Sequence, residues 1–285
     1  MSVASSKKAF PVWTFLTIAA NGFLIAIVVL LVLRHERTAS RRPSQVKISP
    51  LPIASEQLTS SIDQLEKQHP LTYQQWVNLL GKEAKAIVKN KPDRLTILAG
   101  DSLSLWFPSE LLPSDRIWLN QSISGETSIG LLNRLSLFEQ TEPQAIFVMI
   151  GINDLTKGTA DQDLLDSYKQ IIEALKQAHP NSKIVVQSIL PHGANPDATL
   201  EKRQQLLEIS NERIHTLNQA LETIAKSAGV AYLDLQPLVV DDEGYLRSEF
   251  TTDGLHLNRQ GYLVWRSAIQ TFSQLALDSP PAEKP

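Results

Sequence analysis

The chain has 285 residues, 42% hydrophobic and 20% charged, with no cysteine; this composition indicates a globular protein and excludes a disulfide scaffold, a thiol nucleophile and a thiolate metal site. Residues 1–50 hold seven basic side chains and one acidic one, whereas residues 51–285 hold 20 basic and 29 acidic ones. The excess of acidic side chains in residues 51–285 argues against nucleic-acid binding, which requires a basic face toward the phosphates.

An apolar segment near the N-terminus predicts a membrane anchor. After a tail at residues 1–11, residues 12–33 contain no charged side chain. At about 1.5 Å per residue they make about 33 Å of helix, enough to cross the hydrocarbon core of a bilayer. A cleaved secretory signal is the alternative, but its apolar region is usually about 7–15 residues long and ends at small residues. We therefore expect a retained single-pass anchor.

The sequence leaves open on which side of the membrane the residues after the anchor lie. Lys7 and Lys8 precede the span, and five basic side chains follow it between residues 34 and 47. The positive-inside rule would keep the residues after the anchor in the cytoplasm. Two lysines before an apolar run also resemble an uncleaved export signal, which would place them in the periplasm or outside the cell.

The segments beyond the anchor differ in pattern. Residues 34–55 lack periodicity and are rich in Ser, Pro and Arg, so we expect a linker. Residues 56–94 form a helical lead-in, because the stretch 73–90 carries apolar side chains on one helical face and needs a partner surface. One domain is expected over residues 95–277, followed by a polar tail at 278–285.

Within the domain, short apolar runs alternate with helical patterns. The runs are residues 95–100, 116–120, 145–151, 183–190 and 230–235. Apolar side chains recur at helical spacing over residues 164–175, 206–224 and 262–272. Such continuous runs are typical of strands buried on both faces of a parallel sheet, and the alternation predicts a three-layer α/β domain with five parallel strands. Ligands of open parallel sheets bind beyond the carboxyl ends of the strands.

Reactive or hydrogen-bond-donating groups follow the predicted strands. They occur in the motifs Gly100-Asp101-Ser102, Ser124-Gly125-Glu126, Gly151-Ile152-Asn153-Asp154 and Asp253-Gly254-Leu255-His256. Each motif is weak by itself. All four in this order, each just past a predicted strand, make a specific signal.

These groups suit nucleophilic attack on a carbonyl carbon. A serine hydroxyl needs a base to accept its proton, and His256 can serve Ser102 in this way. Asp253 lies three residues before His256, close enough to orient the imidazole and stabilise its cation. The backbone N–H groups of Ser102 and Gly125 and the side-chain amide of Asn153 can stabilise an oxyanion. The predicted catalytic residues are therefore Ser102, Asp253 and His256, with an oxyanion hole of Ser102, Gly125 and Asn153.

The four motifs resemble the sequence blocks of the SGNH hydrolases, also called the GDSL esterase/lipase family. The blocks match at Ser102, Gly125, Asn153 and His256, and Asp253 matches the triad aspartate. The resemblance covers about residues 95–275. It implies a flavodoxin-like sheet and an ester hydrolase. The G-x-S-x-G signature of other serine hydrolases is absent, because position 104 is serine.

Neighbouring polar residues are expected to be structural. Asp101 and Asp154 can cap helices or brace loops. Asp241, Asp242 and Glu243 form a solvated turn with no further ligands nearby, so we expect no metal. We also expect no cofactor. His192 is expected to be an exposed loop residue.

Six apolar side chains follow Ser102, at Leu103, Leu105, Trp106, Phe107, Leu111 and Leu112. They can line an acyl pocket or pack the following helix onto the sheet, and the sequence leaves both open. Apart from residues 191–199 and 236–252, the connections around the site are short, which argues against a large lid and favours small acyl groups such as acetyl.

We therefore expect a membrane-anchored serine esterase that acts on carboxylic esters. Small acyl esters, lipids and acylated glycans all suit such a site. Two alternatives are an acyltransferase, in which another alcohol replaces water, and a tethered binding module without catalysis.

Overall fold

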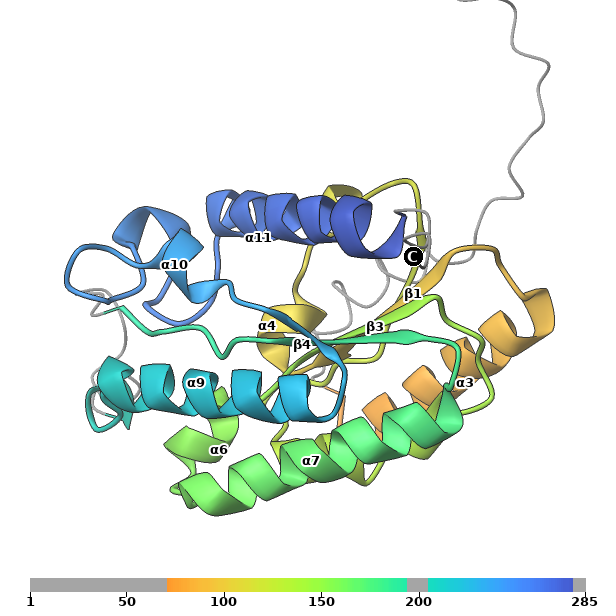
Figure 1. Cartoon of the computed structure of the whole chain (residues 1–285), viewed down its shortest axis with the longest axis horizontal. Coiled ribbons are helices and arrows are strands. Elements are labelled where there is room, and N and C mark those ends of the chain that lie inside the picture. Colours follow the sequence, from red (N-terminus) through yellow and green to blue (C-terminus); the bar gives the residue numbers. More distant parts are fainter. Residues whose placement is uncertain (1–70, 194–204, 279–285) are drawn as a thin grey trace, which may run out of the picture. The chain divides into compact units, whose positions relative to one another are not determined.

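The computed structural model describes residues 71–193 and 205–278, which form an α/β domain around one sheet (Figure 1). The expected tail, anchor and linker of residues 1–55 lie outside these ranges, as do the start of the expected lead-in and the tail from residue 279. No helix of the described ranges is long and apolar enough to cross a membrane. The anchor at residues 12–33 stays a prediction.

The sheet has the predicted five parallel strands. They are β1 (Leu95–Gly100), β2 (Ile117–Asn120), β3 (Ala145–Met149), β4 (Lys183–Gln187) and β5 (Ala231–Leu233). Their order is β2-β1-β3-β4-β5, and every neighbouring pair is parallel. This is the flavodoxin-like order. Because the chain passes from β1 to β2 on one side and then to β3 on the other, the switch point lies between β1 and β3.

Burial differs between the centre and the edges of the sheet. β1 and β3 are buried throughout, and β4 is buried except at Lys183. The expectation of strands buried on both faces is wrong for β2 and β5, whose residues are mostly half-buried or exposed. Each of these edge strands has a neighbouring strand on one side only, so less of its surface is covered.

Long helices cover both faces of the sheet. On one face lie α3 (Tyr73–Asn90), α7 (Asp161–Ala178) and α9 (Asn211–Ser227), and on the other lies α11 (Arg259–Phe272) (Figure 1). α3 buries Trp76, Leu80 and Ala84, which belong to the apolar stripe seen in the sequence. The lead-in helix therefore packs on the domain that follows it.

α9 begins later than the helical pattern at residues 206–224 predicts. The Ser210 side chain accepts a hydrogen bond from the Arg213 N–H at 3.2 Å and forms the N-cap. Serine favours this position because its oxygen satisfies an N–H that has no partner within the helix. Leu206 is buried before this cap, although its spacing also fits the helix.

Short helices turn the chain at the ends of the strands. The short α-helices are α4 (Ser102–Leu105), α5 (Ser128–Leu132), α6 (Ile152–Thr156) and α10 (Gln236–Val239). The 3-10 turns are η1 (Ser109–Leu111), η2 (Leu135–Leu137) and η3 (Ser248–Phe250), and the π-helical turn η4 (Ser273–Leu277) follows α11. α4 and α6 begin just beyond β1 and β3, so both lie at the switch point.

Aromatic side chains fix α4 against α11. The ring centroid of Phe107 lies 5.0 Å from those of Tyr262 and Trp265. The Tyr262 hydroxyl donates to the Leu103 carbonyl at 2.9 Å, and the Trp265 Nε1–H donates to the Gln187 side chain at 2.7 Å. These contacts tie the turn after β1 to the helix layer and to β4.

A buried tyrosine holds the turn after β3. The Tyr168 hydroxyl donates to the Ile150 carbonyl at 2.6 Å and accepts from the Ile150 N–H at 3.1 Å. Gly151 follows with φ +132°, and a Cβ on it would lie 2.7 Å from Ile189 Cδ1. Glycine is therefore required at this position, and α6 starts at a fixed angle to the sheet.

Tyr168→Phe should lower the free energy of unfolding by about 1–3 kcal/mol, because it leaves both backbone groups of Ile150 buried without a partner while keeping the volume of the ring. Chemical denaturation of the whole chain measures this. Tyr245→Phe, at a ring that is 39% exposed, is the matched control and should change little. Equal stability of the two variants would show that the turn does not depend on the Tyr168 hydroxyl.

Candidate active site

Ser102 is the first residue of α4, directly beyond β1. Asp101 caps this helix, because its Oδ1 accepts the Leu103 N–H at 3.0 Å. Gly100 lies so close to β3 that a Cβ on it would come within 2.1 Å of the Met149 carbonyl oxygen. The glycine allows β1 and β3 to stay paired up to their ends, and the aspartate starts the helix at the serine.

The three predicted catalytic side chains form one hydrogen-bonded chain. Ser102 Oγ lies 3.0 Å from His256 Nε2, and His256 Nδ1 lies 2.7 Å from Asp253 Oδ2. The His256 side chain is 12% exposed. A histidine placed between a serine hydroxyl and a carboxylate can accept the hydroxyl proton while the carboxylate stabilises the resulting cation.

The loop that carries His256 is built by hydrogen bonds of its own. Asp253 Oδ1 accepts the backbone N–H groups of Leu255 at 3.0 Å and of His256 at 2.8 Å. The Thr251 hydroxyl donates to the His256 carbonyl at 2.8 Å and accepts the Gly254 N–H at 2.9 Å. This bonding fixes the imidazole before any substrate arrives.

The environment of Asp253 keeps its carboxylate ionised. Partial burial by itself raises the pKa of Asp253. The hydrogen bonds from the His256 ring and from the two backbone N–H groups outweigh burial, and they hold the pKa well below its usual range. A negative charge therefore faces Nδ1 at every pH at which the enzyme would work.

The predicted oxyanion donors surround the same edge of the sheet. The Ile123 N–H donates to the Gly100 carbonyl at 3.1 Å and so joins the loop of Gly125 to the end of β1. Asn153 Nδ2 donates to the Glu126 carbonyl at 3.0 Å, which orients its amide. Gly125 has φ +75°, and the space where a Cβ would stand is open. The loop of Gly125 and the Asn153 amide are thus held in place by hydrogen bonds.

Comparison with known proteins decides the family. Residues 98–264 match the family model described as GDSL-like Lipase/Acylhydrolase family. The chain belongs to this family. The chain is 27% identical over 208 residues to the rat protein named platelet-activating factor acetylhydrolase IB subunit alpha2, covering 68% of this chain and 81% of the relative. With the bovine alpha1 subunit it shares 27% identity over 177 residues, 58% of this chain and 69% of the relative.

A solved structure described as a candidate platelet activating factor from Streptococcus pneumonia shares the fold. Its TM-score is 0.61 at 24% identity, and the match covers 77% of this chain and 97% of that one. Membership of the GDSL-like family, together with the acetylhydrolase relatives, identifies the chain as an ester hydrolase.

Sequence reasoning missed the support beneath the Gly125 loop of this GDSL-like hydrolase. Glu126 forms a buried ion pair with Arg134, whose Nε–H donates at 2.7 Å. The Tyr73 hydroxyl donates to the other Glu126 oxygen at 3.0 Å. Arg134 also donates to the Gln121 carbonyl at 2.7 Å. The 53-residue separation of Tyr73 from Glu126 leaves no local pattern that could have revealed this contact.

Asp154 and Asp241 have structural roles, as the sequence predicted. Asp154 accepts both the backbone N–H and the hydroxyl of Ser128, at 2.8 and 2.6 Å, and so braces α5 against α6. Asp241 accepts two backbone N–H groups within its own turn. No cluster of ligand side chains that could hold a metal occurs among residues 71–193 and 205–278.

His192 is not the exposed loop residue that the sequence led us to expect. It is only 3% exposed, and its Nε2 lies 2.5 Å from the Ile209 carbonyl oxygen. Its backbone exchanges two hydrogen bonds with the Asn211 side chain. A loop after a strand is often exposed, but here the segment at residues 205–210 supplies an acceptor for the imidazole.

The six apolar side chains after Ser102 differ in burial, with Leu105 half-buried between two extremes. Leu103, Phe107, Leu111 and Leu112 are buried in the core, so packing rather than acyl binding explains them. Trp106 is 42% exposed, and its ring lies 4.3 Å from that of His256, between centroids. The sequence could not distinguish these positions, because all are apolar and closely spaced.

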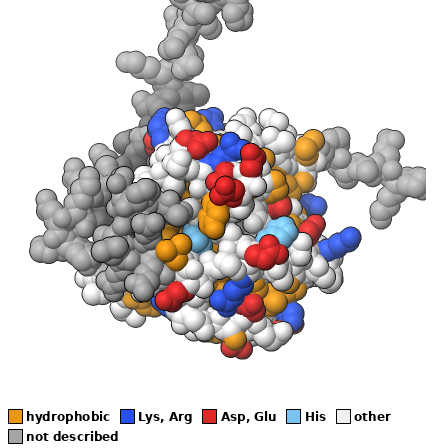
Figure 2. Space-filling view, turned by 90° about the vertical axis from the view of Figure 1, so that its left-hand side faces the viewer, with side chains coloured by type: hydrophobic (Ala, Val, Ile, Leu, Met, Phe, Trp, Pro, Cys, Tyr) orange, Lys and Arg blue, Asp and Glu red, His pale blue; other side chains and the backbone are white. Residues whose placement is uncertain are grey.

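The surface at this edge of the sheet combines several kinds of side chain. Figure 2 shows histidine side chains that reach the surface beside hydrophobic and acidic ones.

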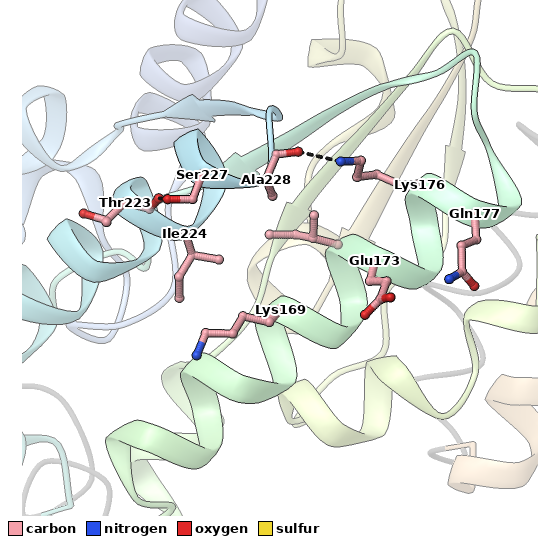
Figure 3. A pocket seen from close by; sticks show the side chains of 9 residues that line it. Lys169, Glu173, Lys176, Gln177, Thr223, Ile224, Ser227 and Ala228 are labelled. Carbon is pink, nitrogen blue, oxygen red and sulfur yellow. Dashed lines mark hydrogen bonds between the residues drawn. The ribbon is translucent and has the colours of Figure 1, made fainter.

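A groove of about 650 Å³ lies elsewhere, between α7 and α9 (Figure 3). Its lining includes Lys169, Lys176 and Thr223 but none of the predicted catalytic residues. The groove is therefore separate from the site of chemistry.

Asp101→Asn should change how stability depends on pH. Burial raises the pKa of Asp101 from 3.8 to about 7, against the hydrogen bond from the Leu103 N–H, and nearby Asp154 and Glu126 raise it further. The folded state therefore binds a proton more tightly than the unfolded state. The stability that this proton contributes is complete below about pH 4 and is lost as the pH rises toward about 7, at about 1 kcal/mol per pH unit.

Unfolding free energies of the wild type and the variant, measured from pH 4.5 to 8, test this. The wild type should lose stability relative to Asp101→Asn as the pH rises. Asp242→Asn, on an exposed turn, is the matched control for removal of one carboxylate. A constant difference between wild type and Asp101→Asn would contradict the assignment.

Proposed function

We propose that the protein hydrolyses carboxylic esters through a catalytic triad of Ser102, His256 and Asp253 and a covalent acyl-enzyme. The observation that carries the proposal is the hydrogen-bonded chain of these residues, with 3.0 Å between Ser102 Oγ and His256 Nε2 and 2.7 Å between His256 Nδ1 and Asp253 Oδ2. Its position at the switch point of the sheet supports the assignment, because ligands of such sheets bind there.

The reaction follows from the positions of the donors and acceptors. Ser102 Oγ attacks the ester carbonyl carbon while His256 Nε2 accepts its proton. The carbonyl oxygen becomes an oxyanion and is bound by the backbone N–H groups of Ser102 and Gly125 and by the Asn153 amide. His256 then passes the proton to the leaving alcohol. Water attacks the acyl-enzyme with the same groups and releases the acid.

We propose a small acyl group such as acetyl. Most of the apolar side chains after the nucleophile are buried in the core, so they leave little surface to hold a long acyl chain. The mammalian relatives are acetylhydrolases by name, which supports the same choice. No step of this mechanism requires a metal or a cofactor.

Ser102→Ala should lower kcat by a factor on the order of 10³ or more, because the three residues act as a unit. Hydrolysis of p-nitrophenyl acetate, butyrate and octanoate by the full chain measures this effect, and the wild type should prefer the acetate. Ser109→Ala, an exposed serine on η1, is the matched control and should keep full activity. A Ser102→Ala variant that keeps its rate would refute the triad, whereas a preference for octanoate would refute only the small acyl group.

We also propose that residues 12–33 anchor the enzyme in a membrane, with residues 34–55 as the linker to the catalytic domain. The support is the uncharged apolar run of 22 residues, because about 20 such residues form a helix that spans a bilayer.

The full chain should stay in the membrane fraction after alkaline carbonate extraction, whereas a variant that lacks residues 12–33 should be soluble with unchanged kcat/KM for p-nitrophenyl acetate. Added protease should digest the domain in intact cells only if it faces outward. Release of the full chain by carbonate, or a shortened N-terminus in the isolated protein, would contradict a retained anchor.

A further inference from the structure

Trp106 lies one helical turn after the nucleophile. Its backbone N–H donates to the Ser102 carbonyl at 3.0 Å, which closes the single turn of α4. Residues four apart in a helix lie on the same side, so the indole and the Ser102 side chain face the same region. The neighbouring Phe107 points the other way, into the core between α4 and α11.

The indole contacts the general base but remains open to solvent. The ring centroids of Trp106 and His256 are 4.3 Å apart, and the rings are tilted by 44°. The His256 side chain is 12% exposed, whereas Trp106 is 42% exposed. Aromatic side chains commonly line ligand sites, so an exposed indole beside a reacting group offers contact area to a ligand.

Packing does not explain this exposed indole. α4 is already fixed by the Phe107 contacts with Tyr262 and Trp265 and by the hydrogen bond from the Tyr262 hydroxyl to Leu103. Trp106 contributes its backbone N–H to the turn, and any residue except proline could supply that group. Its side chain is therefore free to serve the substrate.

The chemistry of the triad decides which half of the ester meets the indole. His256 must give its proton to the leaving oxygen, so the alcohol part lies beside the imidazole. The carbonyl oxygen points instead toward the donors at Gly125 and Asn153. The open surface of Trp106 adjoins His256, and it therefore borders the alcohol part rather than the carbonyl oxygen.

We propose that Trp106 is a specificity-determining residue that selects esters by their alcohol part and favours alcohols that present an apolar ring to the indole. The inference rests on the proposed triad function. Aromatic side chains offer a broad apolar face at low entropic cost, which suits contact with a flat or cyclic group.

The test uses acetate esters of alcohols with similar acidity, namely ethyl, cyclohexylmethyl and benzyl acetate. All three form the same acetyl-enzyme, so kcat/KM compares the acylation step alone. In the full chain, Trp106→Ala should lower kcat/KM for the two cyclic esters about tenfold or more relative to ethyl acetate, a size typical of lost apolar pocket contacts. For Trp106→Phe, kcat/KM for the cyclic esters relative to ethyl acetate should lie between the values for Trp106→Ala and the wild type.

Two controls make the result specific. Leu263→Ala removes an apolar side chain of similar exposure, 39%, from α11 and should leave all ratios unchanged. The ratio of p-nitrophenyl acetate to butyrate hydrolysis, at a fixed alcohol, should change less than about twofold in Trp106→Ala, because the acyl group lies elsewhere. Unchanged melting temperatures show that the variants fold.

Three outcomes would overturn the inference. Unchanged ratios between cyclic and ethyl esters would show that the indole does not meet the alcohol. A changed acyl preference would place it on the acyl side. An equal loss for every ester would show that Trp106 acts only through His256. Failure of the triad itself would instead appear as activity in Ser102→Ala, so the two failures are distinguishable.

Discussion

The carboxylate of Asp253 is the group on which the geometry of the site depends. One oxygen accepts two backbone N–H groups of its own turn, and the other accepts the proton of His256 Nδ1. The same side chain therefore shapes the loop and sets the orientation of the imidazole. Because the loop and the ring are fixed together, Nε2 comes to rest 3.0 Å from Ser102 Oγ without a separate device to position it. This geometry suits the role of base that we propose for His256, because a base that is fixed in advance needs little reorganisation when a nucleophile attacks.

Three buried carboxylates near Ser102 are stabilised in three different ways. Glu126 has a cationic partner in Arg134, Asp154 is bound by a hydroxyl and a backbone N–H of Ser128, and Asp101 receives a single N–H from the helix that it caps. The cost of burying a charge falls as the number and charge of its partners rise. Asp101 has the fewest partners, and correspondingly its pKa is raised to about 7. Asp101, next to Ser102, is thus the carboxylate of the three whose ionised form is stabilised least.

The sequence predicts the parts of this structure that depend on local pattern or on the geometry of parallel sheets. Continuous apolar runs identify the strands, and the carboxyl ends of parallel strands must share one edge, so the sequence predicts that Ser102, Asn153 and His256 lie close together. The link from Tyr73 to Glu126 and the burial of His192 could not be predicted, since both depend on the path of the chain in three dimensions. Likewise, the residues after Ser102 are all apolar, and only the packing of α11 decides that Phe107 is core and Trp106 is open.

The division between Phe107 and Trp106 agrees with the proposal that one fold can keep its reaction and vary its substrate. The groups proposed to act on the carbonyl are built into the sheet edge, where glycine and capping residues leave little freedom for change. The side of the site beyond His256 has no such constraint, because a residue there touches the imidazole with one face and solvent with the other. A change at position 106 would leave the contacts that fix α4 in place. Family membership therefore establishes ester hydrolysis, whereas we propose that the choice of ester depends on exposed side chains such as Trp106.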